Sequence, residues 1–504
     1  MIGRIGDDLL NPLRCRMYSR SLLLVLFCGV GCSPASFVDP PSGLDETITT
    51  STTISDTSQT TSDIPGSLSV RQHDTIGSIL IASWTQETKG QGHVEYNFDD
   101  DIWMLTPTAE YEVGSHEVLL LGIPYQTDVA IRLVMQTENG EKHSEVISEE
   151  TADMPPGLPV PELVTAVPSL YYGQGQFLYT SINGSPGGWT GGQFWQVIID
   201  RQGRVVWAMK TPDQHWTLWT QVSYDGDDLM WDESTVWSWG SSEPSQVHRM
   251  KIDGTILESY ETPGLHHAWD ELADGSIIWG AIINSNEEWL QKLSMDGTEQ
   301  TVWRCSDFEV EMQGETGYSC HSNSWWWHEP TDTYLVSFPS SAGDVRDTVL
   351  HLDNIGQTID TWGRLGDWAF ADEQTTFDYQ HGVTFTETGN LLVSTKLHTS
   401  NPYYQSNLDT LAVREYALDY KTKTLIEVWS FGEDQGIAGN TAGEAHRLSN
   451  GNTLHNYGSG ARTREITPEG QLVWDLKWTN GDSEGSGRLQ GRSVFLEDLY
   501  DYAP

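Results

Sequence analysis

The chain has 504 residues, more than one ordinary domain needs, and a net charge of −45 at pH 7. Uniform negative charge repels phosphate backbones and anionic membranes, so we expect no nucleic-acid partner. The 22 Trp and 48 Gly, together with few strong helix formers, favour an all-β protein with many turns.

Residues 1–32 have the pattern of an export signal. Arg14, Arg16 and Arg20 precede the apolar run 22–27, and small residues then lead to Cys32. This order is typical of a secretory signal peptide, and the run is too short to span a membrane. A cysteine directly after a small residue resembles a bacterial lipoprotein signal in which Cys32 is lipidated. An ordinary secretory signal cut nearby is the alternative.

Residues 33–64 are rich in Ser, Thr and Asp, as in ETITTSTTISDTSQTTSD, and predict a disordered tether. Export with a lipid anchor predicts a protein of the cell envelope whose only membrane contact is that anchor. Without the signal, Cys305 and Cys320 are the cysteines that remain in the folded part. In an oxidising compartment they can form a disulfide, with two free thiols as the alternative.

Residues 65–155 alternate strand-like segments with turns, most clearly in SILIASW, HVEYNF, EVLLLGI and DVAIRLVMQT. The stretch LLLGIPYQTDVAIRLVMQT resembles the late strands of a fibronectin type III domain. We therefore predict a β-sandwich here, followed by the stiff linker PPGLPVPELV.

Residues 158–504 repeat one hairpin: an apolar strand, a turn with Asp or Gly, and a strand that often ends in Trp. The six copies are IIDRQGRVVW, MKIDGTILES, LSMDGTEQTVW, LDNIGQTIDTW, ALDYKTKTLIEVW and ITPEGQLVW. Such a repeat in an all-β chain predicts a propeller with one blade per copy. We expect six blades, with the segment LVTAVPSLYY near the start pairing with the end of the chain.

A second repeated hairpin lies between these copies and carries a histidine at one position in three of four cases. His267 and His381 each lie ten residues before an apolar triplet, and His321 lies thirteen before one because its turn is longer. In a propeller, the same end of every inner strand faces the central channel. We therefore expect these three histidines to converge near the axis.

Convergent histidines permit a metal site or acid–base and nucleophilic catalysis. The sequence has no HExxH, no Cys/His cluster at metal spacing, and no GxGxxG or GxxxxGK[ST] loop. We therefore expect no metal, no cofactor and no nucleotide donor.

The series HHAWDELADG, CHSNS, QHGVTF and GEAHRLSNGNTL resembles the bacterial arylsulfate sulfotransferases, over roughly residues 158–476. The resemblance implies a six-bladed propeller of the cell envelope preceded by a β-sandwich. It also implies an enzyme in which a histidine takes a sulfuryl group from a phenolic sulfate ester and passes it to a phenol. By this resemblance His381 is the nucleophile, His321 and Asn323 belong to the HxNS-type motif, and His266 and His267 are the double-histidine position.

The family has an arginine on the strand after the HxNS motif, where this chain has Phe338 and Pro339. We expect Lys396, at the end of LLVSTK one blade later, to replace it as the cation that binds substrate. Arg462 or Arg464 is the alternative. A lysine gives a point charge where an arginine gives a bidentate fork.

Two further hypotheses stay open beside the enzyme. One is a non-catalytic propeller lipoprotein that binds a ligand or partner, and the other is a metal- or quinone-dependent oxidoreductase on the same fold. The run 325–327, three tryptophans, could line an aryl pocket, although packing explains most propeller tryptophans. His446 and His455 fall outside the aligned position and are interpreted as structural.

Overall fold

The computed structural model describes residues 68–99, 102–138, 140–184, 193–235, 244–284, 287–307, 322–338, 347–397, 409–439, 443–478 and 488–504. These residues form eight β-sheets, which confirms the predicted all-β fold. No helix within these ranges combines the length and the apolar character needed to cross a membrane. The predicted signal peptide, the tether and Cys32 lie outside the described residues.

The first two sheets form a β-sandwich. One sheet contains β1 (Ser69–Gln72), β2 (Leu80–Gln86) and β6 (Gly114–Leu120). The other contains β4 (Met104–Leu105), β3 (Gly90–Asn97), β7 (Asp128–Thr137) and β8 (Gly140–His143), with β5 (Ala109–Tyr111) on β3 and β9 (Ile147–Glu150) on β7. Trp84, Tyr96 and Leu133 lie in the core of the sandwich. Its relation to fibronectin type III domains stays a prediction.

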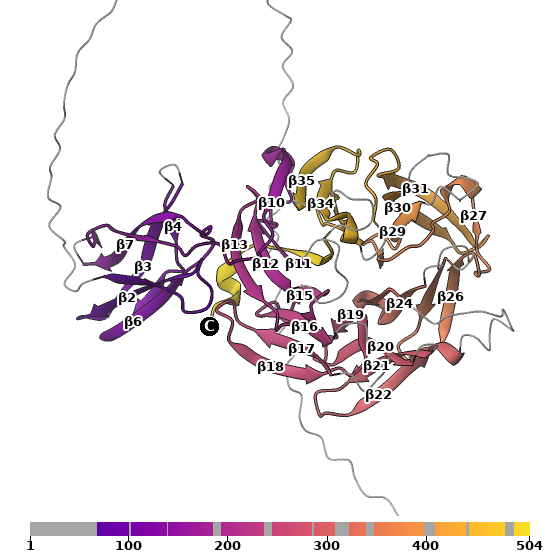
Figure 1. The fold of residues 1–504 in the computed structure, drawn as a ribbon, viewed down its shortest axis with the longest axis horizontal. Helices are drawn as coiled ribbons and strands as arrows, with labels where there is room; N and C mark the ends of the chain where they lie inside the picture. The colour runs from indigo at the N-terminus through magenta and orange to yellow at the C-terminus, as the bar shows by residue number, and fades with distance from the viewer. Residues whose placement is uncertain are drawn as a thin grey trace, which may run out of the picture. The chain divides into compact units, whose positions relative to one another are not determined.

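The other six sheets are blades around a common axis (Figure 1). From the axis outward, blade 1 contains β36 (Gln490–Leu496), β11 (Phe177–Asn183), β12 (Phe194–Asp200) and β13 (Val205–Lys210). Blade 2 contains β15 (Thr220–Val222) and β14 (His215–Trp216), which both pair with β16 (Leu229–Thr235), then β17 (Ser245–Met250) and β18 (Ile256–Glu261). Blade 3 contains β19 (Leu265–Glu271), β20 (Ile277–Asn284), β21 (Glu287–Leu293) and β22 (Glu299–Arg304).

Blade 4 contains β23 (Ser324–His328), β24 (Thr333–Phe338), β25 (Thr348–Leu352) and β26 (Thr358–Gly363). Blade 5 contains β28 (Val383–Phe385), β29 (Leu391–Leu397), β30 (Thr410–Asp419) and β31 (Thr424–Phe431), with β27 (Ala369–Phe370) parallel to β31. Blade 6 contains β32 (Glu444–Arg447), β33 (Thr453–Asn456), β34 (Arg462–Ile466), β35 (Leu472–Trp478) and β10 (Pro161–Ala166). The 3-10 helices are η1 (Pro168–Leu170), η2 (Glu329–Thr331), η3 (Glu373–Thr375), η4 (Gly458–Gly460) and η5 (Leu499–Tyr502).

The repeated hairpin forms the outer pair of strands in each blade, and its turn explains the repeated Asp-Gly pattern. In the turn between β17 and β18, Asp253 Oδ1 accepts the amide of Thr255 at 2.8 Å. Gly254 between them has a φ of 84°, a left-handed conformation that costs glycine little. Glycines in four other outer turns have φ values of 80–84°, and in blade 5 the position belongs to Lys423. Each repeat is thus a tight hairpin.

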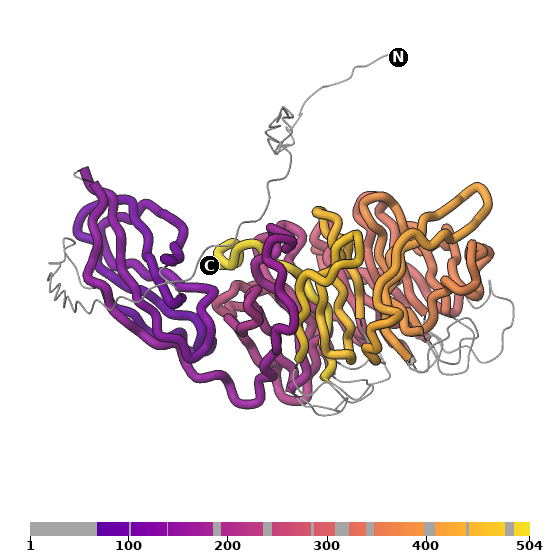
Figure 2. Tube along the Cα trace, turned by 90° about the horizontal axis from the view of Figure 1, so that it is seen from above, coloured from indigo at the N-terminus to yellow at the C-terminus, as the bar shows by residue number. Residues whose placement is uncertain are grey.

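Both ends of the propeller chain close the ring. β10 pairs with β35, with Pro161 opposite Trp478, as the sequence predicts for the segment LVTAVPSLYY. In addition, β36 pairs with β11, with Phe177 opposite Leu496, so the C-terminal strand is the innermost strand of blade 1. Figures 1 and 2 show this yellow segment beside the magenta strands. The sequence analysis did not predict the second pairing.

A buried ion pair lies where blades 1 and 6 meet. Arg201 donates to Glu465 at 2.8 Å, and their side chains are 7% and 0% exposed. Glu465 also accepts the amide of Tyr172 and the side chain of Asn452, each at 2.7 Å. The Arg201 guanidinium lies 4.1 Å from the ring centre of Phe495 on β36. This cluster therefore joins the two blades through which the ring closes.

We expect Arg201→Ala to destabilise the propeller by about 3–5 kcal/mol, because it leaves the Glu465 carboxylate buried without its partner. Denaturant unfolding followed by tryptophan fluorescence measures this loss. Lys210→Ala is the control, since Lys210 and Asp213 form an exposed pair that contributes about 0–1 kcal/mol. Equal effects of the two substitutions would contradict a closing role for Arg201.

Candidate active site

The innermost strands of all six blades surround a small cavity at their N-terminal ends. Each blade contributes to its wall: Arg492, Trp219, His267, Asn323, Gly382 and Glu444, from blades 1 to 6 in that order. The open volume is about 20 Å³. A group bound there therefore contacts side chains from several blades at once.

His381 lies at this end, directly before β28. Its amide donates to Ser394 O at 3.1 Å, and the Ser394 amide donates to Gly382 O at 2.8 Å, so both residues are held against β29. A Cβ on Gly382 would lie 2.5 Å from Cα of Glu444, which no side chain tolerates. Glycine is thus required for this segment to pack against blade 6, and His381 is fixed beside the axis.

The residues before His381 fix the orientation of its ring. Tyr379 has a φ of 44°, and its amide donates to Asp347 Oδ1 at 2.5 Å. The Gln380 side chain donates to Phe338 O at 3.0 Å, which anchors the segment to blade 4. Nδ1 of His381 lies 3.3 Å from Tyr379 O. Because a carbonyl can only accept, this hydrogen bond requires a proton on Nδ1 of His381.

The structure distinguishes the two neighbouring histidines on β19. The β19–β20 register shifts between Leu265 and Trp269, and His267 within this bulge has a φ of 64°. Bulges commonly redirect a side chain beside a functional site. His267 lines the cavity, and its ring centre lies 6.5 Å from that of His381 at an interplanar angle of 78°. His266 lies behind it, with Nδ1 3.6 Å from Glu288 Oε1 and its ring centre 4.1 Å from that of His267.

Asn323 reaches the cavity from the segment directly before β23. Its amide donates to Ser337 O at 3.0 Å, and the residue is 4% exposed. Both polar atoms of its side chain lack a hydrogen-bond partner among the described residues. A buried amide of this kind is available to a ligand, because buried polar groups are otherwise nearly always paired. His321, predicted to converge with His267 and His381, lies outside the described residues.

Arg492 on β36 is the only lysine or arginine among the described residues that line the cavity. It donates to Gln221 Oε1 at 2.8 Å, and its guanidinium lies 4.8 Å from the ring centre of Trp219. Its Nε lies 3.8 Å from Glu444 Oε1. The preceding glycine allows this placement, since a Cβ on Gly491 would lie 2.3 Å from Leu218 O. No local motif marks Arg492, and only the pairing of β36 with β11 brings it to the axis.

The cations chosen from the sequence have other partners. Lys396 is 7% exposed, its Nζ lies 3.3 Å from Asp409 Oδ2, and it lies 5.8 Å from the ring centre of Tyr379. It is therefore near the His381 segment but does not line the cavity. The alternatives on β34 both bind Asp475, Arg462 at 2.5 Å and Arg464 at 3.2 Å.

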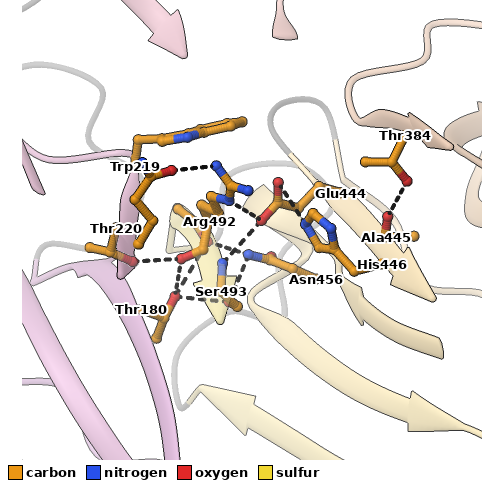
Figure 3. Close-up of polar contacts among 12 residues, drawn as sticks. Thr180, Trp219, Thr220, Thr384, Glu444, Ala445, His446, Asn456, Arg492 and Ser493 are labelled. Atoms are coloured by element: carbon orange, nitrogen blue, oxygen red, sulfur yellow. Dashed lines mark hydrogen bonds and ion pairs between the residues drawn. The ribbon is translucent and has the colours of Figure 1, made fainter. Parts of the chain in front are cut away.

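Glu444 on β32 links Arg492 to His446 (Figure 3). Its Oε2 lies 3.2 Å from His446 Nε2, and its Oε1 accepts the amide of Ser493 at 3.1 Å. Burial opposes ionisation of this carboxyl, but His446 and Arg492 outweigh it and hold its pKa below the ordinary value of 4.5. The carboxylate is thus ionised at neutral pH and holds the Arg492 side chain in place.

The depressed pKa of Glu444 predicts a pH dependence of stability. Its contribution is fully present above pH 4.5 and is lost as the pH falls through the lower pKa of the folded state. We expect the Glu444→Gln protein to lose less unfolding free energy below pH 4.5 than the unsubstituted protein does. Unfolding free energies of both proteins across this acid range test the expectation, and parallel curves would contradict it.

Cys305, at the end of β22, is disulfide-bonded, whereas Cys320, its predicted partner, lies outside the described residues. No group of three or more His, Cys, Asp or Glu side chains within the described ranges is placed to hold a metal ion. His455, interpreted as structural, is buried between blades, with Nε2 3.0 Å from Ser394 Oγ.

Fold and site together define a six-bladed propeller whose axis carries histidines, an amide and a guanidinium, a set suited to bind and transfer an anionic group. Residues 294–479 match the family model of the arylsulfotransferases (ASST). This range includes Asn323 and His381 but neither His267 nor Arg492, and it is shorter than the resemblance found in the sequence.

Comparison with curated proteins finds no match. A solved protein of unknown function from Bacteroides caccae is 14% identical, with a TM-score of 0.40, and covers 63% of this chain and 99% of its own. Virginiamycin B lyase from Staphylococcus aureus is 12% identical, with a TM-score of 0.31, and covers 59% of this chain and 88% of its own. These likenesses are too low to carry a functional assignment.

Proposed function

We propose that the protein is an arylsulfate sulfotransferase that moves a sulfuryl group from a phenolic sulfate ester to a phenol through His381. The observation that carries the proposal is the placement of the His381 ring, whose centre lies 6.5 Å from that of His267, the histidine that lines the axial cavity together with Asn323 and Arg492. The match of residues 294–479 to the arylsulfotransferase family model supports the same reaction class.

In the first half-reaction, the Nε2 lone pair of His381 attacks the sulfur of the donor. An N–S bond forms, the bond from sulfur to the aryl oxygen breaks, and its electron pair leaves with the phenolate. A phenol has a pKa of about 10, so this group departs with modest help from an acid. Tyr379 O supports the step because it accepts a hydrogen bond from the Nδ1 N–H and so stabilises the positive charge that develops on the ring.

Donors around the axis stabilise the charge during transfer. The sulfuryl group keeps three oxygens, and Arg492 and the Asn323 amide are placed to donate to them. His267 faces His381 and is proposed to donate a proton to the leaving aryl oxygen. By the family resemblance, His321 is a further donor. His266 contacts the His267 ring and lies beside Glu288, and we assign it a positioning role.

In the second half-reaction, the oxygen of an acceptor phenol attacks the sulfur. An O–S bond forms, the N–S bond breaks, and the phenol proton passes to the group that protonated the first phenolate. His381 recovers its lone pair, so no cofactor is consumed. The partners are thus aryl sulfates and phenols.

We further propose that the protein is exported and anchored in the cell envelope through a lipid on Cys32. The support is the sequence of the first 32 residues and of the polar segment that follows them. Labelling of intact cells with a radioactive fatty acid tests the anchor, and Cys32→Ala should remove the label.

A chromogenic aryl sulfate with phenol as acceptor tests the proposed activity. We expect purified protein to release the coloured phenolate and to form phenyl sulfate. Because transfer occurs in two halves, initial rates at several acceptor concentrations should give the parallel double-reciprocal lines of a ping-pong mechanism. No release of phenolate above a blank would overturn the proposal.

A further inference from the structure

The inner strands enclose a second cavity at their other end, with a volume of about 430 Å³. Residues from blades 1 to 5 line it, including the last residues of β15, β19, β23 and β28. This volume lies within the range of sites for small ligands. The proposed sulfotransferase chemistry does not use this cavity.

The two cavities lie at opposite ends of the same strands. On β23, Ser324 lines the histidine end and His328 lines the second cavity. Four residues of an extended strand span about 13 Å, so the two cavities are separated by about this distance along β23. Among the described residues, Arg492 alone lines both cavities; it donates to Gln221 at 2.8 Å and lies beside Glu444. A ligand in the second cavity would thus lie well away from His381.

Aromatic rings form the walls of the second cavity. The ring centre of His328 lies 5.5 Å from that of Trp326 and 4.9 Å from that of Phe385. Tyr224 also lines the cavity; it is 46% exposed, and its ring centre lies 6.0 Å from that of Trp327. Burial lowers the pKa of His328, so at neutral pH this ring adds no positive charge. An apolar body in the cavity can therefore contact aromatic side chains from blades 2, 4 and 5.

The charges that face this cavity are mostly negative. Arg492 is the one cation among the described residues that line it, and four carboxylates line it as well: Asp270, Glu271, Glu329 and Glu387. Arg249, which does not line the cavity, pairs with Glu271 at 3.2 Å. The exposed Glu387 lies in the turn after β28. The cavity therefore disfavours anions, unlike the histidine end.

We propose that this second cavity binds an organic cation, an ammonium group carried on an aromatic or alkyl body. Aromatic faces attract such a cation through their quadrupole, and carboxylates at the rim add a screened attraction of the same sign. The cavity thus selects a ligand of opposite charge to the sulfate esters proposed for the other end.

Calorimetric titration of the purified protein tests this site with three probes of similar size: benzyltrimethylammonium, benzyl alcohol and benzenesulfonate. We expect the cation to bind at least about tenfold more tightly than the other two, because cation–π contacts in partly desolvated sites reach about that factor. Added salt should weaken binding of the cation and leave binding of the alcohol unchanged. Benzenesulfonate binding as tightly as the cation would overturn the proposal.

Substitutions locate the bound cation. Trp326→Ala should weaken its binding roughly tenfold, and Trp326→Phe should restore most of it. Glu387→Gln should weaken it by a smaller factor, whereas Glu469→Gln, the same charge change in an exposed turn of blade 6, should not. His381→Ala should leave it unchanged, which separates this site from the proposed catalytic one. Unchanged cation binding in a folded Trp326→Ala protein would contradict the assignment.

Discussion

Replacement of His381 by alanine is expected to lower the sulfotransferase rate by a factor on the order of 10⁴ or more, because it removes the atom that attacks sulfur. The fold should survive, since the segment is held by the His381 amide, by the Gln380 side chain and by Gly382. The measurement is the release of phenolate from a chromogenic aryl sulfate, at saturating donor and acceptor.

His143→Ala on the sandwich is the matched control, because this partly exposed histidine belongs to β8 and not to the axis. Added imidazole should restore part of the rate of His381→Ala, since free imidazole can occupy the space and attack the donor. A fully active His381→Ala protein would remove His381 from the mechanism and leave another nucleophile to be found.

Replacement of Arg492 by glutamine is expected to lower kcat by roughly 10²- to 10³-fold, the usual cost of losing a charged donor to the transferring group. The effect should appear mainly in kcat, because charge on the sulfuryl group and the bridging oxygen changes most in the transition state. Arg492→Lys should retain part of the activity, since lysine keeps the charge but loses the fork of donors.

Lys396→Met is the comparison that decides between the two cations. Lys396 pairs with Asp409 and does not line the cavity, so this variant should lose much less activity than Arg492→Gln. Guanidinium ion should partly rescue an Arg492→Ala protein, which a purely structural role would not permit. A large loss with Lys396→Met and none with Arg492→Gln would return the anion-binding role to Lys396.

The repeats made much of this architecture predictable. Six outer hairpins, each with a turn that carries Asp or Gly, predicted the blade count, since each turn needs a residue that tolerates a left-handed backbone. The second hairpin then placed His267 and His381 at equivalent ends of inner strands, and their rings are in contact. Within the run 325–327, Trp325 is a packing residue as expected, with 1% exposure, whereas Trp326 and Trp327 line the second cavity.

Other parts of the site depend on geometry that no local pattern carries. Arg492 reaches the axis only because β36 pairs with β11, two segments that lie at opposite ends of the propeller chain. The choice between His266 and His267 depends on a bulge in β19, and a shift of one residue reverses the side that a strand residue faces. Lys396 has the expected position in its blade, but Asp409 on the neighbouring segment binds it.

The most direct test of the account is to trap the intermediate. The protein is incubated with an aryl sulfate in the absence of any phenol acceptor. It is then digested under alkaline conditions that preserve the N–S bond of a sulfohistidine, and the peptides are analysed by mass spectrometry. The account predicts one sulfuryl group per chain, on the peptide that contains His381, and its loss when phenol is added. Phenolate release with no label on His381, or label on another residue, would contradict it.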